Sequence, residues 1–226
     1  MKFRVYALTI ALVFAQVSAV AQWADYGLWS SASVSQKVAK KTYASADFAA
    51  RLDRDFSRLG TTFIDSEISR EVLNDINLGV AIRVGGSQTD EYQWEARRRF
   101  AFNAKYKTKV GDKSSLSFRL QYQSGTKGTG PIDFSNAARF KASYIYKLSK
   151  EYRLSLSSEV FFKPVYSSYE WSDTRGRISI RKKISKRRYV KFGYQLEFPR
   201  FGPDPWVEHA IICNFSLEKK RRKSGK

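Results

Sequence analysis

The feature that most constrains the fold is an alternation of apolar side chains with basic or hydroxylic ones, repeated in segment after segment. In 115–124, for example, Phe118 and Leu120 alternate with Arg119 and Gln121. A period of two indicates β-strands. The same period, weaker in most cases, runs through 26–39, 42–56, 61–72, 75–86, 92–108, 138–148, 152–163, 174–184, 190–198 and 206–218. Each segment is about as long as the roughly 9–11 residues that a tilted strand needs to cross a bilayer.

In every segment one set of alternate positions is apolar and the other set is polar, and we call these sets the apolar and the polar parity. This arrangement favours a closed sheet with an apolar outside and a polar inside. We therefore predict an all-β fold, a single antiparallel up-and-down transmembrane β-barrel. Eleven segments can be counted, but bacterial single-chain barrels use an even number of strands. We expect ten to twelve strands and favour twelve, with a further strand hidden in 26–72.

The connections between these segments differ in length. Tight links occur at 110–113, 149–151 and 185–188, and longer ones, rich in Gly, Pro, Ser and Asp, at 85–91, 124–135, 164–173 and 199–205. Aromatic residues on the apolar parity flank both kinds, namely Tyr106, Tyr146, Tyr152, Trp94, Tyr122, Phe162 and Phe198. Short periplasmic turns, longer external loops and two aromatic girdles are typical of outer-membrane barrels.

The amino-terminal residues contain the basic, apolar and small-residue regions of a secretory signal peptide in their usual order. Lys2 and Arg4 precede the apolar run 5–17, and Ala19-Val20-Ala21 supplies the small residues of a cleavage site before Gln22. The apolar run is too short to anchor the chain as a membrane-spanning helix. The sequence thus predicts a signal peptide at 1–21, a barrel at 22–218 and a basic tail at 219–226, in the outer membrane of a bacterial cell.

Charge and cysteine content exclude some classes of protein. The net charge is +20, and it falls to +18 when 1–21 are removed with Lys2, Arg4 and no acidic residue. Such a balance would suggest nucleic acid in a cytoplasmic protein, but export argues against that partner. No later segment approaches 18 consecutive apolar residues. Cys213 is the single cysteine, so no intramolecular disulfide is available.

The polar parity carries many charged side chains that are expected to line the lumen. The candidate residues are Arg97, Arg99, Arg119, Arg139, Lys141, Arg153, Glu159, Arg175, Arg177 and Glu197. Opposite charges in a narrow barrel can pair and fill it, which would make a closed, structural barrel. Surplus arginine can instead make an electropositive pore that draws in anions. The sequence leaves both interpretations open.

Catalytic and metal-binding motifs are weak. His209 is the single histidine and lies on the apolar parity, where a lipid-modifying barrel enzyme would place its catalytic base. Such an enzyme would have a serine two residues further on, but this chain has Ile211 there. Nucleophilic catalysis needs the base within hydrogen-bond reach of the nucleophile, so we predict no enzyme and keep the His209 enzyme as the alternative. The glycine-rich 125–130 follows a strand and opens no helix, so no phosphate cradle is predicted. We expect no cofactor and no metal.

The chain ends in the basic run 219–223. This run is either a solvated tail or a segment attracted to anionic phospholipid of the periplasmic leaflet. The partners that we expect are outer-membrane lipid and, through the lumen, small anionic solutes, and not nucleic acid. The sequence predicts no oligomeric state.

Several short motifs resemble a known family. They are Asp25-Tyr26-Gly27-Leu28-Trp29, Lys40-Lys41, Arg97-Arg98-Arg99-Phe100, Phe118-Arg119-Leu120-Gln121-Tyr122, and Leu154-Ser155-Leu156 followed by Glu159-Val160-Phe161-Phe162. Together they are similar to the domain-of-unknown-function family 2490. The resemblance covers nearly the whole chain after 1–21. It implies an outer-membrane barrel without assigned activity, and it carries over no catalytic or ligand-binding residue.

Overall fold

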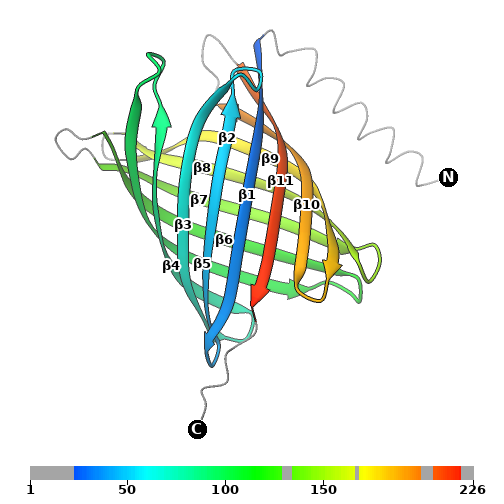
Figure 1. Cartoon of the computed structure of the whole chain (residues 1–226). Coiled ribbons are helices and arrows are strands. Elements are labelled where there is room, and N and C mark those ends of the chain that lie inside the picture. Colours follow the sequence, from blue (N-terminus) through cyan, green and yellow to red (C-terminus); the bar gives the residue numbers. More distant parts are fainter. Residues whose placement is uncertain (1–22, 129–133, 166–167, 200–205, 220–226) are drawn as a thin grey trace.

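The computed structural model describes residues 23–128, 134–165, 168–199 and 206–219, and the predicted signal peptide and all of the tail but Lys219 lie outside them. Long strands dominate the described chain (Figure 1). They are β1 (Trp23–Ala39), β2 (Thr42–Asp53), β3 (Arg58–Leu73), β4 (Ile76–Gln88), β5 (Trp94–Lys109), β6 (Ser114–Lys127), β7 (Phe134–Lys147), β8 (Tyr152–Val165), β9 (Ser168–Ser185), β10 (Arg188–Pro199) and β11 (Trp206–Lys219). The described residues include no helix long and apolar enough to cross a membrane.

The strands form one closed up-and-down barrel, as predicted. Strands that follow each other in sequence pair antiparallel, and β1 closes the barrel by pairing parallel with β11, with Trp23 opposite Trp206. The favoured count of twelve is wrong, because the described barrel has eleven strands. Residues 23–73 hold three strands of 17, 12 and 16 residues, which leaves no room for the fourth. An odd number is accommodated because a parallel pair of strands also completes the hydrogen bonding between β1 and β11.

Strand ends also differ from the sequence predictions. The predicted long loop 164–173 is largely strand, since β8 extends to Val165 and β9 begins at Ser168. The loops predicted at 85–91 and 124–135 are shortened in the same way, because β4 continues to Gln88 and β6 to Lys127. Gly, Ser and Pro weaken the alternation there without ending the strands, because backbone pairing to a neighbour continues past them.

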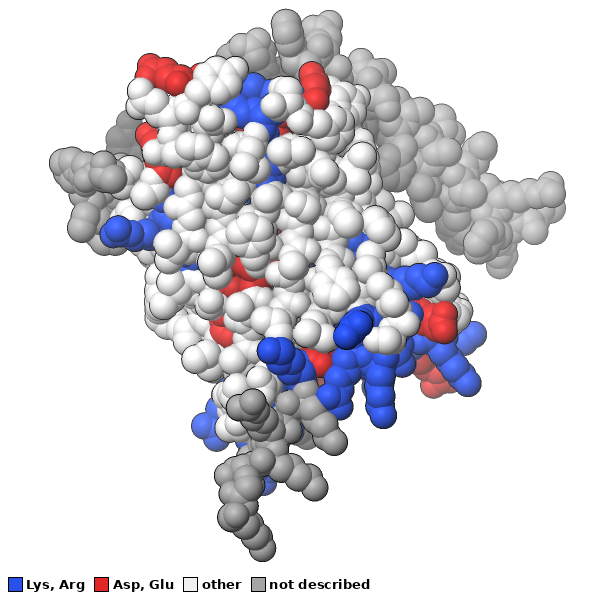
Figure 2. Space-filling model, viewed as in Figure 1, with Lys and Arg blue, Asp and Glu red and all other residues white. Residues whose placement is uncertain are grey.

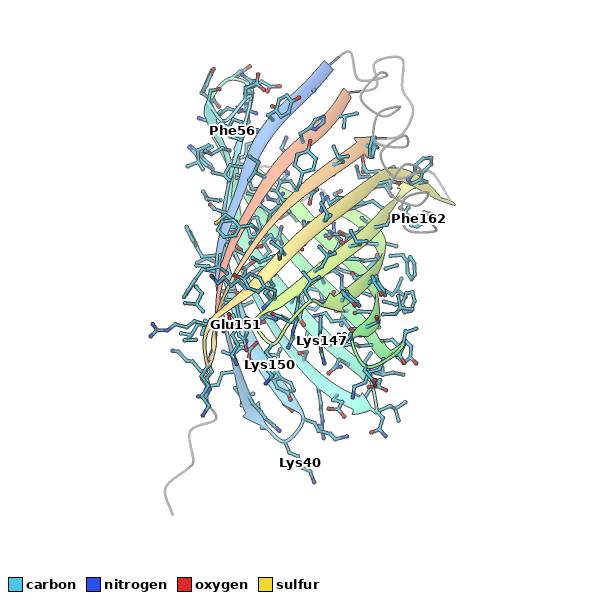
Figure 3. All side chains as sticks on the ribbon, turned by 90° about the vertical axis from the view of Figure 1, so that its right-hand side faces the viewer. Lys40, Phe56, Lys147, Lys150, Glu151 and Phe162 are labelled. Atoms are coloured by element: carbon cyan, nitrogen blue, oxygen red, sulfur yellow. The ribbon has the colours of Figure 1, made fainter. Side chains whose placement is uncertain are left out.

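The two ends of the barrel have different connections. The two-residue turns 40–41 and 74–75 lie at one end, which we call the short-turn end, together with 110–113, 148–151 and 186–187. Lys41 and Asp75 adopt positive φ angles of 60° and 69° in their turns, as tight hairpins require. Figure 3 shows Lys40 at this end and Phe56, in the hairpin between β2 and β3, at the opposite end.

The alternation predicted from the sequence is present on the two faces of the sheet. Large apolar side chains point outward and are exposed, among them Leu120 (58% exposed), Phe102 (55%) and Phe192 (54%). Inward positions on the same strands are buried, as for Gln121 (4%) and Ala101 (1%). On the face drawn in Figure 2 most of the middle is uncharged, and Lys and Arg gather at the lower right, around the ends of β9 and β10.

Candidate functional site: the basic lumen

The lumen contains a cavity of about 710 Å³. Ten serines line it together with charged side chains that are strongly biased to one sign. Among the described residues that line it, three contribute negative charge, Asp47, Asp65 and Glu159. Twelve are cations, namely Arg51, Arg83, Arg99, Lys107, Arg119, Arg139, Lys141, Arg153, Arg175, Arg177, Arg181 and Lys191. Because the surrounding wall lowers the dielectric, this surplus produces a strong positive potential in the cavity.

One side of the lumen is crossed by guanidinium groups that stack on aromatic rings. The ring of Phe63 on β3 lies between Arg83, whose Cζ is 3.6 Å from the ring centroid, and Arg51, at 5.1 Å. The Arg51 guanidinium also covers the ring of Trp29 on β1, at 3.8 Å. Delocalised, weakly hydrated arginine is well suited to such stacking.

A second arginine also contacts Trp29 and continues the series. Arg175 reaches across from β9, with its Cζ 5.1 Å from the Trp29 ring and 4.7 Å from the ring of Phe161. Arg139 completes the series, 4.4 Å from the same Phe161 ring. We call the series Arg83, Phe63, Arg51, Trp29, Arg175, Phe161 and Arg139 the arginine–aromatic belt. It joins β1 and β9, which are not neighbours in the sheet, so the belt links strands through side chains in the lumen.

A glycine makes room for one ring of the belt. Gly85 on β4 pairs with Phe63 on β3. A Cβ atom at Gly85 would lie 2.6 Å from both Cα and Cβ of Phe63 and 2.1 Å from the carbonyl oxygen of Thr62. Any larger residue would therefore displace Phe63, and with it the surface on which Arg83 and Arg51 stack.

Glu159 is the acidic centre of the charged network. Its side chain is 3% exposed and lies 2.6 Å from Arg119, 2.8 Å from Arg139 and 3.7 Å from Arg175. Arg175 also contacts Glu197, at 2.7 Å. Three arginines thus share one buried carboxylate, which offsets only part of their charge.

Asp65 has a similar role nearer to β4. It accepts hydrogen bonds from Arg83 and from Arg99, which approaches to 2.9 Å. Arg99 donates in addition to Gln123, as does Arg139, at 3.3 Å in both cases. Two of the three acids of the cavity wall, Asp65 and Glu159, are therefore already engaged by arginines.

Several predicted lumen residues line the cavity and two do not. Those on its wall are Arg99, Arg119, Arg139, Lys141, Arg153, Glu159, Arg175 and Arg177. Arg97 has inward parity but is exposed where β5 approaches the end opposite the short turns. Glu197 lies outside the cavity lining and contacts it through Arg175.

Sequence reasoning did not single out Arg83, Lys107, Lys191 or Trp29 as lumen residues, although all four line the cavity. The parity signal was available for Lys191, which alternates with Val190 and Phe192. The contact of Trp29 with Arg175 had no signal, since it joins β1 and β9, which are far apart in sequence. The contacts of Phe63 with Arg83 and of Trp29 with Arg51 join consecutive strands, but a period of two does not show which side chains stack.

His209 faces outward in an aromatic cluster. Its ring stacks on Tyr26, with centroids 4.8 Å apart, and its Nδ1 shares a hydrogen bond with the Tyr194 hydroxyl. Among the described residues no serine hydroxyl is hydrogen-bonded to it. The described residues also contain no group of three or more His, Cys, Asp or Glu placed to hold a metal ion.

The family model described as "Protein of unknown function (DUF2490)" matches residues 26–206. The chain belongs to the DUF2490 family. The matched region of this DUF2490 barrel runs from β1 to the first residue of β11 and so contains most of the cavity wall.

Two of the solved structures that are similar to this DUF2490 chain are porins. The first, described as "NanC porin structure in rhombohedral crystal form", has a TM-score of 0.46 and 8% identity, over 75% of this chain and 86% of that one. The second, an anion-selective porin from Comamonas acidovorans, has a TM-score of 0.39 and 10% identity, over 78% of this chain and 52% of the porin. No curated protein matches the chain.

Proposed function

We propose that this protein is an outer-membrane barrel that acts as a narrow, passive channel with a preference for anions. The observation that carries the proposal is the lining of the cavity, with twelve cationic and three anionic side chains. In a confined pore, rings of Arg and Lys select anions because they stabilise anions and repel cations.

The outside of the barrel supports a location in a membrane. Exposed apolar side chains occur on the outward parity of several strands, for example Ile64 (54%), Ile82 (55%) and Phe140 (43%). A soluble monomer rarely exposes so extensive an apolar surface. A lipid environment would cover it, as the apolar band of outer-membrane barrels requires.

A second candidate function, a closed structural barrel, is favoured by a different observation. The arginine–aromatic belt and the contacts of Glu159 tie several strands together across the lumen. If the belt fills the bore, the lumen stabilises the barrel and the loops carry its function.

The alternative of a lipid-modifying enzyme using His209 has less support. A catalytic histidine must reach a nucleophile, and the described hydrogen-bond partner of His209 is the phenol of Tyr194. We propose no enzymatic role.

The location is tested by cell fractionation with N-terminal sequencing. We expect the protein in the outer-membrane fraction with Gln22 as its first residue, because Ala19-Val20-Ala21 fits signal-peptidase cleavage. Recovery from the cytoplasm with Met1 intact would contradict both the signal peptide and the outer-membrane proposal.

The transport proposal is tested in planar bilayers. We expect a small conductance. In a KCl gradient the reversal potential should shift toward the equilibrium potential of chloride. The conductance should rise in the double variant Arg119→Ser, Arg139→Ser, since both side chains occupy the lumen and Arg139 belongs to the belt. A matched control removes two exposed arginines, Arg54 and Arg98, that do not line the cavity.

The possible outcomes separate the two candidates. Large, cation-selective conductance of the wild type would contradict the channel and the closed barrel alike. An anion-conducting wild type that the lumen variant leaves unchanged would contradict the closed barrel alone. A silent wild type that conducts only after Arg119 and Arg139 are shortened would favour the closed barrel.

A further inference from the structure

The cationic side chains of the cavity are not equally engaged. Arg119, Arg139 and Arg175 share Glu159, and Arg83 and Arg99 share Asp65. In contrast, Lys141 on β7 and Lys191 on β10 make no ion pair or hydrogen bond with any described residue. Two ammonium groups thus face the cavity without a partner.

Arg177 on β9 lines the same cavity as these two lysines. Its like charge repels the ammonium groups of both. Arg177 itself donates to the neutral amide oxygen of Gln195, from Nε at 3.1 Å. We call Lys141, Arg177 and Lys191 the cation triad.

The nearby carboxylates do not neutralise the cation triad. Glu159 pairs with Lys141 in the strand register but already contacts three arginines. Asp47 attracts Lys191 but forms no ion pair with it, and its buried Oδ1 has no hydrogen-bond partner among the described residues. A surplus of positive charge therefore remains at this point of the wall, and an anion entering the cavity would offset it.

The wall around the cation triad offers further donors. Ser157 on β8 is in register with both Ser143 and Arg177, so hydroxyl groups lie between the strands that carry the cations. The Nε atoms of Arg119 and Arg139 are buried without a hydrogen-bond partner. A buried donor without an acceptor costs free energy, and an oxygen-rich ligand would supply acceptors.

We infer that the cation triad is a binding site for a small anion that carries two or more negative charges on phosphate or carboxylate oxygens. A monovalent ion would offset one of three like charges, whereas a multivalent ion can contact several donors at once. The cavity of about 710 Å³ is within the range of small-molecule sites, roughly 300–1,000 Å³. The inference rests on the proposed function, because it names the class of anion that the lumen holds.

The inference is tested by calorimetric titration of the purified full-length barrel in detergent. The probes are pyrophosphate and citrate, with acetate as the monovalent comparison at equal ionic strength. We expect saturable binding of at least one multivalent probe and none of acetate. Tighter pyrophosphate indicates a phosphate ligand, and tighter citrate a carboxylate ligand. Absence of binding by both multivalent probes would overturn the inference.

The variant Lys141→Gln, Lys191→Gln removes two cations from the triad. We expect it to weaken binding by roughly tenfold or more, since charge-assisted hydrogen bonds are lost. The control Lys150→Gln, Lys186→Gln removes the same charge from exposed turns at the short-turn end and should change affinity by less than about twofold. Equal losses in both variants would show non-specific attraction and overturn the inference.

Thermal unfolding shows whether the variant barrel is intact. Because Lys141 and Lys191 are repelled by Arg177, the double variant should melt no lower than the wild type without probe. The probe should raise the melting temperature of the wild type and of the control, and not that of the double variant. If the double variant does not fold, Lys141→Gln and Lys191→Gln are titrated singly, and wild-type affinity in both would overturn the inference.

The proposed function is tested by conductance and the inferred anion site by binding, so either can be contradicted while the other stands. A barrel that conducts anions but binds neither multivalent probe contradicts the cation triad as a site and leaves the proposed function intact. A cation-selective barrel contradicts the proposed function even if a multivalent probe binds.

Discussion

Replacing Glu159 by Gln is expected to lower the free energy of unfolding by about 3–5 kcal/mol, the usual effect of removing one partner from a buried ion pair. The carboxylate is 3% exposed and is contacted by Arg119, Arg139 and Arg175. Without its charge, these arginines repel one another and Lys141 in a confined space. Glutamine keeps the volume and one acceptor, so the loss measures the charge and not the packing.

The measurement is equilibrium unfolding in denaturant, with the barrel in phospholipid vesicles. The matched control is Glu218→Gln at the short-turn end, where Glu218 is 49% exposed and pairs with Arg181 at 3.1 Å. Exposed pairs contribute about 0–1 kcal/mol, so the control should be nearly neutral. If Glu159→Gln is as mild as the control, water in the lumen already screens the arginines, and the network around Glu159 does not hold the barrel together.

The sequence predicts the class of fold and most strand positions because both depend on a local signal. Alternation such as Phe118, Arg119, Leu120, Gln121 determines which side chains can face an apolar environment. A shift of the strand register by one residue would move every side chain of the strand to the opposite face of the sheet. Eleven segments can be counted from this signal, and the expectation of twelve comes from the rule that bacterial barrels use an even number of strands. The closure of a barrel with an odd number of strands has no such local signal. It depends on whether β1 meets β11 in parallel, with Gly27 opposite Ala210, which is a contact between the two ends of the chain.

The candidate site also has one part that a local signal predicts and one part that depends on contacts between strands. Inward parity alone indicates Arg139, Lys141 and Glu159 as lumen residues, and all three line the cavity. It cannot show that Glu159 is shared by three arginines while Lys141 has no ion pair among the described residues. That difference depends on side-chain reach between strands, and the inferred anion site depends on that difference.

Replacing Leu120 by Arg is expected to destabilise the barrel in phospholipid vesicles by about 2–4 kcal/mol, the cost of a cation facing lipid near the middle of a bilayer. Leu120 is 58% exposed on the outer face, midway along β6 (Ser114–Lys127).

The neighbouring change Arg119→Gln should have a much smaller effect. Arg119 points into the lumen, and its loss leaves Glu159 in contact with Arg139 and Arg175. Adjacent positions on one strand thus serve as each other's control, because they share backbone pairing and depth and differ in the face of the sheet. Unfolding in vesicles compares the two variants directly. Equal stability of both variants would mean that the outer face of β6 does not lie against lipid, and the membrane location proposed for this barrel would be wrong.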